Sequence, residues 1–398
     1  ADLVVVNTCA VREKSEEKLS SYLGRLEPIK RKKPVRIAVI GCVAKIRGRE
    51  LLEKQAVVDY VLGPDNAARL PALARETEPR KFVSTSGSKE WQEIPPEIIL
   101  HQSPVSAFVT VMEGCDNFCA YCIVPYARGR EKYRPFSSIL GEAGDLARKG
   151  YVEIQLLGQN VNSYRDPDSG RSFTDLLSAV TGVDGLRWIR FLTSHPKNFR
   201  PETAEVMAAH ETICKQLHLP LQSGSSAVLE RMKRGYSRGD YLDIVSSVRR
   251  LMPDISLSTD IIAGFPGESE KDFEETLTAI REVRFTNIFS FRYSPRPRTA
   301  AAKLGDPVPE EEKRRRLEEI QRLQKSIQLE NHARQVGRTM TVLCPGRARK
   351  TPDLFTGRNE GHQVVNFQSD QDCTSRFVDV RITGFGPYSL LGEHVPNR

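Results

Sequence analysis

Three cysteines stand close together in the run MEGCDNFCAYCIVPYARGRE, where Cys115, Cys119 and Cys122 follow a C-x3-C-x2-C spacing. No fourth cysteine or histidine lies nearby to complete a structural zinc site, which needs four protein ligands. Three thiolates can instead hold three irons of a 4Fe-4S cluster and leave the fourth iron for S-adenosylmethionine (SAM). One electron from such a cluster would split SAM into methionine and a 5'-deoxyadenosyl radical. The spacing therefore predicts a radical SAM site; the alternative is three buried cysteines spaced by chance.

Two further cysteines end apolar runs that we expect to be strands. Cys9 lies in NTCAVREK and Cys42 in VIGCVAK, so both thiols should emerge at one edge of a parallel sheet, before a helix N-terminus. The helix dipole and free amides there favour thiolate, although a structural role is the commoner one for such a pair. Cys214, Cys344 and Cys373 lack partner spacing and are interpreted as ordinary buried or partly buried thiols.

The composition indicates a cytoplasmic enzyme of two or three domains. The chain has 398 residues, 39% of them hydrophobic, and no apolar run approaches the roughly 18 residues that would span a membrane. Eight cysteines without a signal peptide favour a reducing compartment and argue against a disulfide framework. The net charge of +8 suggests a polyanionic partner, and the alternative is plain solubility.

The pattern of apolar runs predicts three domains, which would position these residues. Residues 1–95 alternate short strands (3–7, 36–42, 60–64) with helices (12 to about 27, about 47–55), which predicts a parallel α/β domain that ends in a linker at Pro95-Pro96. Residues 101–332 contain six strand candidates, at 105–112, 152–157, 187–192, 215–219, 257–264 and 287–293. They predict a partial (β/α)6 barrel with its site at the carboxyl ends of the strands.

The end of the chain has a different pattern. A charged helix at about 309–335 is expected to pack and connect, with no functional role. Residues 334–397 hold β-branched strands at 339–344, 362–367 and 377–383, which predict a small all-β barrel. The barrel is only mildly basic, so its composition by itself does not establish RNA binding.

The order of these motifs resembles one known family along nearly the whole chain. The motifs are NTCAVREKSEEK, GCVAK, GCDNFCAYCIVPYARGREKYRP, LLGQNVNSY, RFLTSHPK, HLPLQSGS, STDIIAGFPGE and YSPRPRTAAA. Together they resemble the methylthiotransferase family, and the last domain is similar to a TRAM domain. GQNVN, and NTC followed by VREK, favour the MiaB-type branch, the tRNA-2-methylthio-N(6)-dimethylallyladenosine synthases. The sister branches act on threonylcarbamoyladenosine in tRNA or on ribosomal protein S12 and remain alternatives.

The resemblance implies the activity and the partners. A radical SAM methylthiotransferase of this branch adds a methylthio group to C2 of N(6)-isopentenyladenosine at position 37 of tRNA. We expect the same activity of this chain. The partners would be the tRNA anticodon stem-loop and an electron donor such as flavodoxin or ferredoxin, and the protein would be a monomer that does not bind membranes. A rival from another class is a non-catalytic iron-sulfur sensor that binds RNA.

The resemblance also implies two 4Fe-4S clusters. In the family, three N-terminal cysteines hold an auxiliary cluster, and Cys9 and Cys42 match two of them. The first of the three belongs to a leading strand and helix, whereas this sequence begins at Ala1. We therefore expect an N-terminally truncated chain that lacks one auxiliary ligand.

Residues near SAM are expected where motifs follow strands. They are Gln159, Asn160, Ser194, His195, Gln222 and Ser223 after the next strands, and Gly264, where the chain could approach the adenine closely. The resemblance further implies that Tyr121, inside the cysteine loop, flanks the adenine. The alternative for each is an ordinary turn or helix cap. Basic residues follow the cysteine loop, the fourth strand unit and the sixth strand. Arg128, Arg134, Arg234 and Arg296 among them are predicted to contact RNA phosphates; the alternative is a solvated surface.

Overall fold

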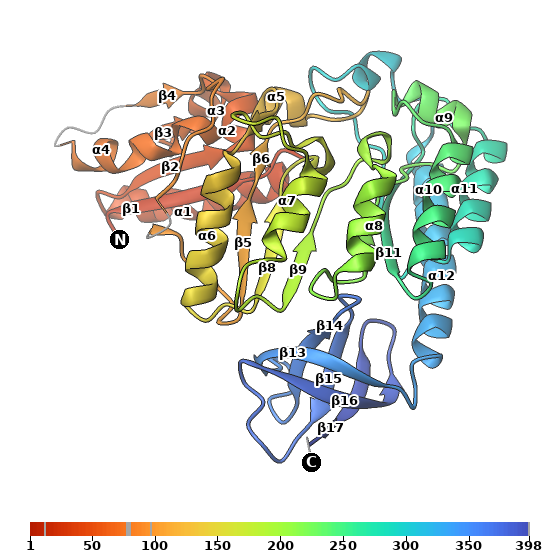
Figure 1. The fold of residues 1–398 in the computed structure, drawn as a ribbon. Helices are drawn as coiled ribbons and strands as arrows, with labels where there is room; N and C mark the ends of the chain where they lie inside the picture. The colour runs from red at the N-terminus through yellow and green to blue at the C-terminus, as the bar shows by residue number, and fades with distance from the viewer. Residues whose placement is uncertain (12, 77–80, 96–97, 397–398) are drawn as a thin grey trace. The chain divides into compact units, whose positions relative to one another are not determined.

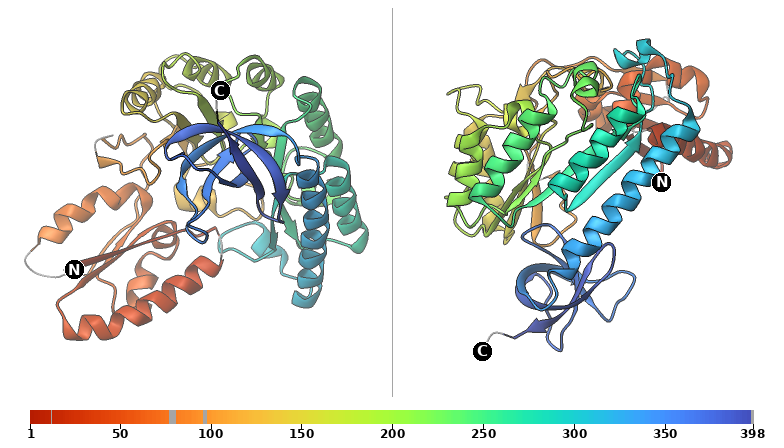
Figure 2. Two further views of the ribbon diagram at one scale, coloured as in Figure 1. Left: turned by 90° about the horizontal axis from the view of Figure 1, so that it is seen from below. Right: turned by 90° about the vertical axis from the view of Figure 1, so that its right-hand side faces the viewer.

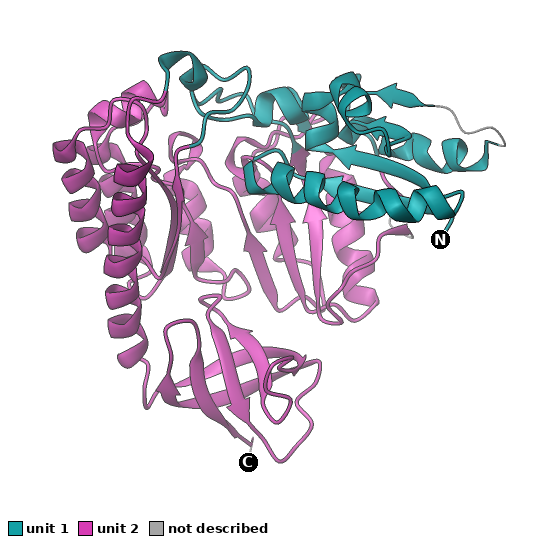
Figure 3. Cartoon of the chain, turned by 180° about the vertical axis from the view of Figure 1, so that it is seen from behind, with its two compact units in different colours: residues 1–93, 113–132, 294–305 teal, residues 94–112, 133–293, 306–398 magenta. Residues whose placement is uncertain are grey.

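The computed structural model describes residues 1–11, 13–76, 81–95 and 98–396. Two compact units make up the chain (Figure 3). Unit 1 contains residues 1–93, 113–132 and 294–305, and unit 2 contains residues 94–112, 133–293 and 306–398. Two predicted features reach outside the described residues, namely the start of the first helix at Arg12 and the Pro96 half of the linker.

Unit 1 is built on a four-stranded parallel sheet, as the short apolar runs predicted. Its strands lie in the order β1 (Leu3–Thr8), β2 (Arg36–Gly41), β3 (Tyr60–Leu62) and β4 (Phe82–Ser84). The helices are α1 (Glu13–Lys32), α2 (Cys42–Arg47), α3 (Arg49–Lys54), η1 (Pro64–Arg69) and α4 (Leu70–Arg75). The unit also holds α5 (Val124–Arg128) and η5 (Ala301–Leu304). The sequence did not predict β4, because three residues show no clear periodicity.

Two predicted helices of unit 1 have different bounds in the structure. Helix α1 does not stop near Glu27 but continues through Pro28 to Lys32. The Nζ of Lys30 donates to Asp59 Oδ2 at 2.5 Å and to the Val57 carbonyl at 2.8 Å, and these bonds stabilise the last turn despite the proline. The helix expected at about 47–55 is instead two short helices, α2 and α3, separated at Gly48.

Unit 2 contains all six predicted strands, arranged as an open barrel of parallel strands (Figure 1). One sheet has the order β5 (Ser106–Thr110), β8 (Glu153–Leu157), β9 (Trp188–Phe191), and the other has the order β10 (Gln216–His218), β11 (Ser256–Ala263), β12 (Asn287–Arg292). A single parallel bridge between Ile189 and Ile213 joins the two sheets. The short strands β6 (Met112–Glu113) and β7 (Lys132–Tyr133) form a separate pair.

Helices cover the outer face of these strands (Figure 2). They are α6 (Phe136–Arg148), α7 (Phe173–Val180), α8 (Pro201–Ala209), α9 (Ser226–Arg231), α10 (Arg238–Leu251) and α11 (Glu270–Val283), with the 3-10 turns η3 (Val161–Ser163) and η4 (Pro196–Asn198). Three of them begin with a capping box, formed by Ser172 and Asp175, by Ser237 and Asp240, and by Ser269 and Asp272. One large apolar core lies between the strands and these helices.

The last part of unit 2 is a helix followed by a closed barrel. Helix α12 (Glu310–Ala333) leads into five strands in the order β13 (Thr339–Arg347), β14 (Phe355–Asn359), β15 (Val364–Gln368), β17 (Leu390–Val395), β16 (Arg376–Phe385). The sequence predicted the all-β barrel and three of these strands, and it missed β14 and β17. Within the described ranges, no helix has both the length and the apolar character needed to cross a membrane.

Candidate cluster and cofactor sites

Cys9 and Cys42 occupy equivalent places in the sheet of unit 1. Thr8 pairs with Gly41 at the carboxyl ends of the parallel neighbours β1 and β2, and each cysteine comes next in the chain. Cys9 is exposed and accepts a hydrogen bond from the backbone N–H of Val11, with a nitrogen to sulfur distance of 3.4 Å. Cys42 is half-buried and opens helix α2. The structure thus brings both thiols to one edge of the sheet.

The cysteine triplet lies in the same unit, between β6 and α5. Cys119 is buried, Cys115 and Cys122 are half-buried, and the N–H of Cys122 donates to the Cys119 carbonyl at 2.9 Å. Gly114 has a φ of +83°, and a Cβ there would overlap the carbonyl oxygen of Arg130, so only glycine fits where the loop begins. The loop is thereby folded tightly on itself.

Helix α5, which follows the cysteine triplet, packs in the apolar core of unit 1. Ile123 and Ala127 of α5 belong to the same apolar core as Val43 and Ala44 of α2, the helix that begins at Cys42. Although the triplet and Cys42 are far apart in sequence, one packed core holds both of their supporting helices. Both cysteine sets therefore belong to one compact unit.

The donor set fits an iron-sulfur cluster better than a single metal ion. Among the residues that the structure describes, no three His, Cys, Asp or Glu side chains are grouped to hold one ion. A 4Fe-4S cluster makes a different demand, because each thiolate binds its own iron. Burial raises the pKa of the Cys115 thiol to about 11, so without a metal this group is a neutral thiol. Three sulfur donors on one tight loop supply the soft ligands that iron-sulfur clusters take.

In unit 2, the predicted SAM residues gather at the carboxyl ends of the strands. Gln159 and Asn160 follow β8, Ser194 and His195 follow β9, Gln222 and Ser223 follow β10, and Gly264 follows β11. The Oδ1 of Asn160 and the Oγ of Ser194 are buried and have no hydrogen-bond partner among the described residues. Buried polar atoms are nearly always bonded, so these two are suited to a bound ligand.

Two residues that the sequence analysis missed share this property. Both side-chain polar atoms of Asn162 and the hydroxyl of Tyr293 are buried without a partner in the described part of the chain. Asn162 lies in LLGQNVNSY and Tyr293 opens YSPRPRTAAA, so motif membership was a signal that could have found them. The unbonded buried atoms after β8, β9 and β12 could form hydrogen bonds with SAM, because SAM is rich in polar groups.

Other predicted residues already have partners within the chain. The Ser223 hydroxyl lies 3.3 Å from Thr276 Oγ1 and accepts from the N–H of Ser225 at 3.2 Å. His195 Nδ1 accepts from the N–H of Lys197 at 3.2 Å. Burial, with smaller effects of the cations Arg234 and Lys197, lowers the pKa of His195 to about 2. His195 is therefore a neutral group that caps η4.

Gly264 and Tyr121 are the two remaining residues that were predicted to lie near SAM. At Gly264, which has a φ of +74°, the group that approaches closely is the side chain of Lys313, because a Cβ there would overlap Lys313 Cγ. This contact is a reason for the glycine within the chain, and the close approach of an adenine stays a prediction. Tyr121 lies half-buried in the cysteine loop of unit 1.

The predicted phosphate ligands are mostly buried. Arg134 forms an ion pair with Glu142, Arg234 donates to the Pro220 carbonyl at 3.0 Å, and Arg296 lies 3.6 Å from Glu16. A buried and bonded guanidinium would have to break these contacts to reach a phosphate, so the structure argues against that role for these three. Arg128 keeps a third of its side chain exposed and pairs with Glu113 at 3.1 Å. It remains a candidate.

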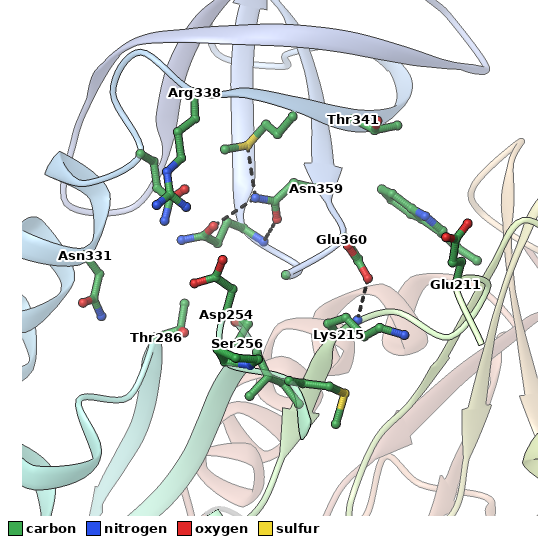
Figure 4. A pocket seen from close by; sticks show the side chains of 18 of the residues that line it. Glu211, Lys215, Asp254, Ser256, Thr286, Asn331, Arg338, Thr341, Asn359 and Glu360 are labelled. Atoms are coloured by element: carbon green, nitrogen blue, oxygen red, sulfur yellow. Dashed lines mark hydrogen bonds between the residues drawn. The ribbon is translucent and has the colours of Figure 1, made fainter. Parts of the chain in front are cut away.

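A cavity of about 1180 Å³ lies at the other end of the six-stranded core (Figure 4). Its described lining comes from the amino ends of β9 to β12, the end of α12 and the closed barrel, and includes Lys215, Asp254, Arg338 and Glu360. The lining that the structure describes contains none of the predicted SAM residues. This cavity is therefore separate from the candidate cofactor site.

Comparison with known proteins agrees with the fold. A model described as "Radical SAM superfamily" matches residues 109–280, "Uncharacterized protein family UPF0004" matches residues 1–63 and "TRAM domain" matches residues 333–395. A solved radical S-adenosylmethionine methyltransferase, TsrM from Kitasatospora setae, has a TM-score of 0.55 at 17% identity. The match covers 75% of this chain and 63% of that one. The open barrel with its three-cysteine loop thus defines a radical SAM protein.

Curated relatives identify the family. A tRNA-2-methylthio-N(6)-dimethylallyladenosine synthase from Geobacter metallireducens is 46% identical over 397 residues, which is 99% of this chain and 90% of the relative. A protein of the same name from Moorella thermoacetica is 42% identical, with 99% and 90% covered. The chain belongs to this family of radical SAM methylthiotransferases. Membership brings an iron-sulfur cluster and SAM as cofactors.

Proposed function

We propose that this protein transfers a methylthio group to C2 of N(6)-isopentenyladenosine in tRNA, next to the anticodon. The supporting observation is the pairing of the cysteine loop with the strand-end cysteines in one compact unit. The relatives carry the name of this reaction over almost the whole chain. The three functional parts would be the methylthiotransferase domain at 1–95, the radical SAM core with its connecting helix at 101–332, and the TRAM domain at 334–397.

The proposed cofactors are two 4Fe-4S clusters and SAM. Cys115, Cys119 and Cys122 would hold the cluster that binds SAM, and Cys9 and Cys42 would supply two thiolates to the auxiliary cluster. When bound, the first cluster and SAM supply a 5'-deoxyadenosyl radical. The orphaned atoms of Asn160, Asn162 and Ser194 would hydrogen-bond SAM and fix its orientation.

The proposed substrate is the anticodon stem-loop, where an unpaired base can be moved into a pocket at modest cost. Arg128 directly follows the cysteine loop and would meet a phosphate near the reacting base. The remaining proposals are a flavodoxin or ferredoxin as electron donor, a monomeric state and a cytoplasmic location.

The test is reductive cleavage of SAM by the reconstituted protein with dithionite. The wild-type chain should release 5'-deoxyadenosine, and the triple variant Cys115→Ala, Cys119→Ala, Cys122→Ala should release none, because no thiolate remains to hold the SAM-binding iron. Cys344→Ala, which changes a buried cysteine of the closed barrel, is the matched control and should keep the activity. Cleavage by the triple variant would show that the cluster lies elsewhere.

The same assay separates the enzyme from the rival sensor. Release of 5'-deoxyadenosine by the wild-type chain supports the enzyme, and its absence with an intact cluster supports a non-catalytic RNA-binding protein. Mass spectrometry of the nucleosides of a treated tRNA then distinguishes isopentenyladenosine from threonylcarbamoyladenosine as the modified base.

A further inference from the structure

Helix α12 was expected from its sequence to pack and connect, and its contacts in the structure are specific. Within unit 2, its first turns lie against the loops that follow β11 and β12, at the end of the core that holds the orphaned polar atoms. Lys313 and Arg316 are spaced by three residues and face these loops, and both are buried, with 0% and 5% exposure. Two buried cations at one place need a specific reason, because charge is costly to remove from water.

Lys313 contacts three separate segments. Its Nζ lies 2.5 Å from Asp306 Oδ2 and 2.8 Å from Glu310 Oε1, so its charge is neutralised by two carboxylates. Its methylene chain packs over the backbone of Gly264, where a Cβ would overlap it. The Nζ also lies 5.7 Å from the centre of the Tyr293 ring, within the range of a cation-π contact. One side chain therefore joins α12 to the residues that follow β11 and β12.

Arg316 holds the segment that follows β11 through Glu268. Its Nη1 donates to the Glu268 carbonyl at 3.0 Å and to Glu268 Oε2 at 2.9 Å. The same carboxylate oxygen accepts from the N–H of Gly264 at 2.6 Å. The segment GFPGE is thus closed on itself through Glu268 and fixed to α12 through Arg316. Every polar group named in this contact is bonded.

The Tyr293 hydroxyl is the exception in this network. It is buried and has no hydrogen-bond partner among the described residues, although its ring is held by Lys313 and by an edge-on contact with Phe265 at 5.4 Å. Burial raises the pKa of Tyr293 to about 12, so the hydroxyl is neutral and can either donate or accept a hydrogen bond. Its neighbours hold the ring and leave the polar tip unbonded.

We propose that Lys313 positions the segment after β11 and the Tyr293 ring so that the Tyr293 hydroxyl bonds to bound SAM. Lys313 is the positioning residue, and Tyr293 is the residue that touches the cofactor. SAM is the fitting ligand because Asn160, Ser194 and Tyr293 follow three strands of one parallel barrel, β8, β9 and β12, so all three residues lie at its carboxyl end. The inference rests on the proposed function, since it requires that SAM binds at this end of the core.

The direct test is Tyr293→Phe, with Tyr388→Phe as the matched control because Tyr388 is 81% exposed on the closed barrel. The dissociation constant for SAM is measured by calorimetry on reconstituted protein, the KM for SAM by 5'-deoxyadenosine release, and the melting temperature by calorimetric unfolding. Tyr293→Phe should raise both SAM constants about three- to tenfold, the value of one hydrogen bond. Its melting temperature should not fall, because the hydroxyl has no bond to lose within the described chain.

The positioning role is tested by Lys313→Met, which keeps the methylene volume and removes the charge. Lys325→Met, an exposed lysine on the same helix, is its control. Lys313→Met should lower the melting temperature and also raise the KM for SAM, whereas the kcat should change less. The double variant Lys313→Met, Tyr293→Phe should raise the KM by less than the product of the single effects, because Lys313 acts through Tyr293.

Two results would overturn the inference. Wild-type SAM affinity in Tyr293→Phe with a lower melting temperature would mean that the hydroxyl bonds to an internal water. Unchanged SAM constants in Lys313→Met would reduce the lysine to a purely structural group. Failure of the wild-type chain itself to cleave SAM would instead contradict the proposed function, so the two failures are distinguishable.

Discussion

Two sets of buried polar groups, at opposite ends of the six-stranded core in unit 2, differ in how they are bonded. At the amino end, Arg190 of β9 is 1% exposed, and each nitrogen of its guanidinium has a partner. Its Nε donates to Glu153 at 2.7 Å, and its Nη atoms donate to the carbonyls of Glu360 at 2.6 Å and Asn359 at 2.9 Å. At the carboxyl end, Asn160, Asn162, Ser194 and Tyr293 have buried polar atoms without described partners.

We expect the bonded and the unbonded groups of these two sets to have different roles. Arg190 joins the core to the closed barrel, and Trp188 packs edge-on against Phe377 of that barrel at 4.8 Å. A fully bonded buried charge holds two parts of the chain together. A buried polar atom that lacks a bond stabilises nothing by itself and is available to a ligand. Arg190 and Trp188 therefore form a joint between the core and the closed barrel, whereas the unbonded atoms of the carboxyl end stay candidates for contact with a ligand.

The largest expected effect concerns the joint. Arg190→Met leaves the Glu153 carboxylate buried without its cation and should destabilise the attachment of the closed barrel by about 3 to 5 kcal/mol. Trp188 lies at this contact, so its fluorescence in a urea titration reports the loss. The affinity for SAM should stay within about twofold of the wild type. The control is Arg250→Met, at an exposed position, and an unchanged urea midpoint in Arg190→Met would show that the joint does not depend on this charge.

Acidification should lower the free energy of unfolding by a smaller amount, because each end of the core has a neutral histidine whose pKa is lowered by burial. Burial, and then the charges of Arg190 and Arg358, lower the pKa of His362 to about 3, and burial lowers that of His195 to about 2. Each folded-state pKa lies below the unfolded value of about 6.5, so protons favour the unfolded chain between these values. Stability should fall as the pH drops below about 6.5, by at most about 1.4 kcal/mol per pH unit for each histidine.

The measurement is the free energy of unfolding between about pH 7 and pH 5. His362→Gln should reduce the pH dependence for the closed barrel and leave that of the carboxyl end unchanged. An identical pH slope in this variant and the wild type would mean that His362 is protonated, or exposed, in the folded protein.

The smallest effect compares two serines at the carboxyl end itself. Ser194→Ala removes an unbonded hydroxyl and should weaken SAM binding about three- to tenfold with little change in stability. Ser223→Ala removes a hydroxyl bonded to Thr276 and Ser225, so it should cost about 1 kcal/mol of stability and leave SAM affinity unchanged. The paired measurements are calorimetric SAM affinity and thermal unfolding. The reverse pattern would contradict the assignment of unbonded atoms to the ligand.

Much of the fold could be predicted because it depends on local pattern. Short apolar runs such as residues 3–7 and 60–64 predicted β1 and β3, since a strand buried in a parallel sheet carries few polar residues. Strands β4, β14 and β17 were missed because their residues form no such run, and α1 passed through Pro28 because Lys30 is bonded to another segment. Local signals fail where distant contacts decide the outcome.

The cysteine chemistry could be predicted from the sequence without a structure. The spacing of Cys115, Cys119 and Cys122 predicted an open cluster, and the apolar runs before Cys9 and Cys42 predicted that both thiols leave one edge of a sheet. The type of ligand follows from the cysteine spacing, and the place of each thiol follows from the apolar run before it. Residue identity and spacing along the chain are therefore enough to read them.

Which polar side chains are already bonded could be seen only in the folded chain. Arg134 and Arg296 have the composition of phosphate ligands, yet each is buried against a carboxylate. The partner of Arg190 is a carbonyl 170 residues away, and the group that requires Gly264 is a lysine on α12. Hydrogen bonds are short and directional, so a partner is chosen by how distant segments pack. That packing leaves Ser194 and Tyr293 unbonded and thereby marks where a ligand can bind.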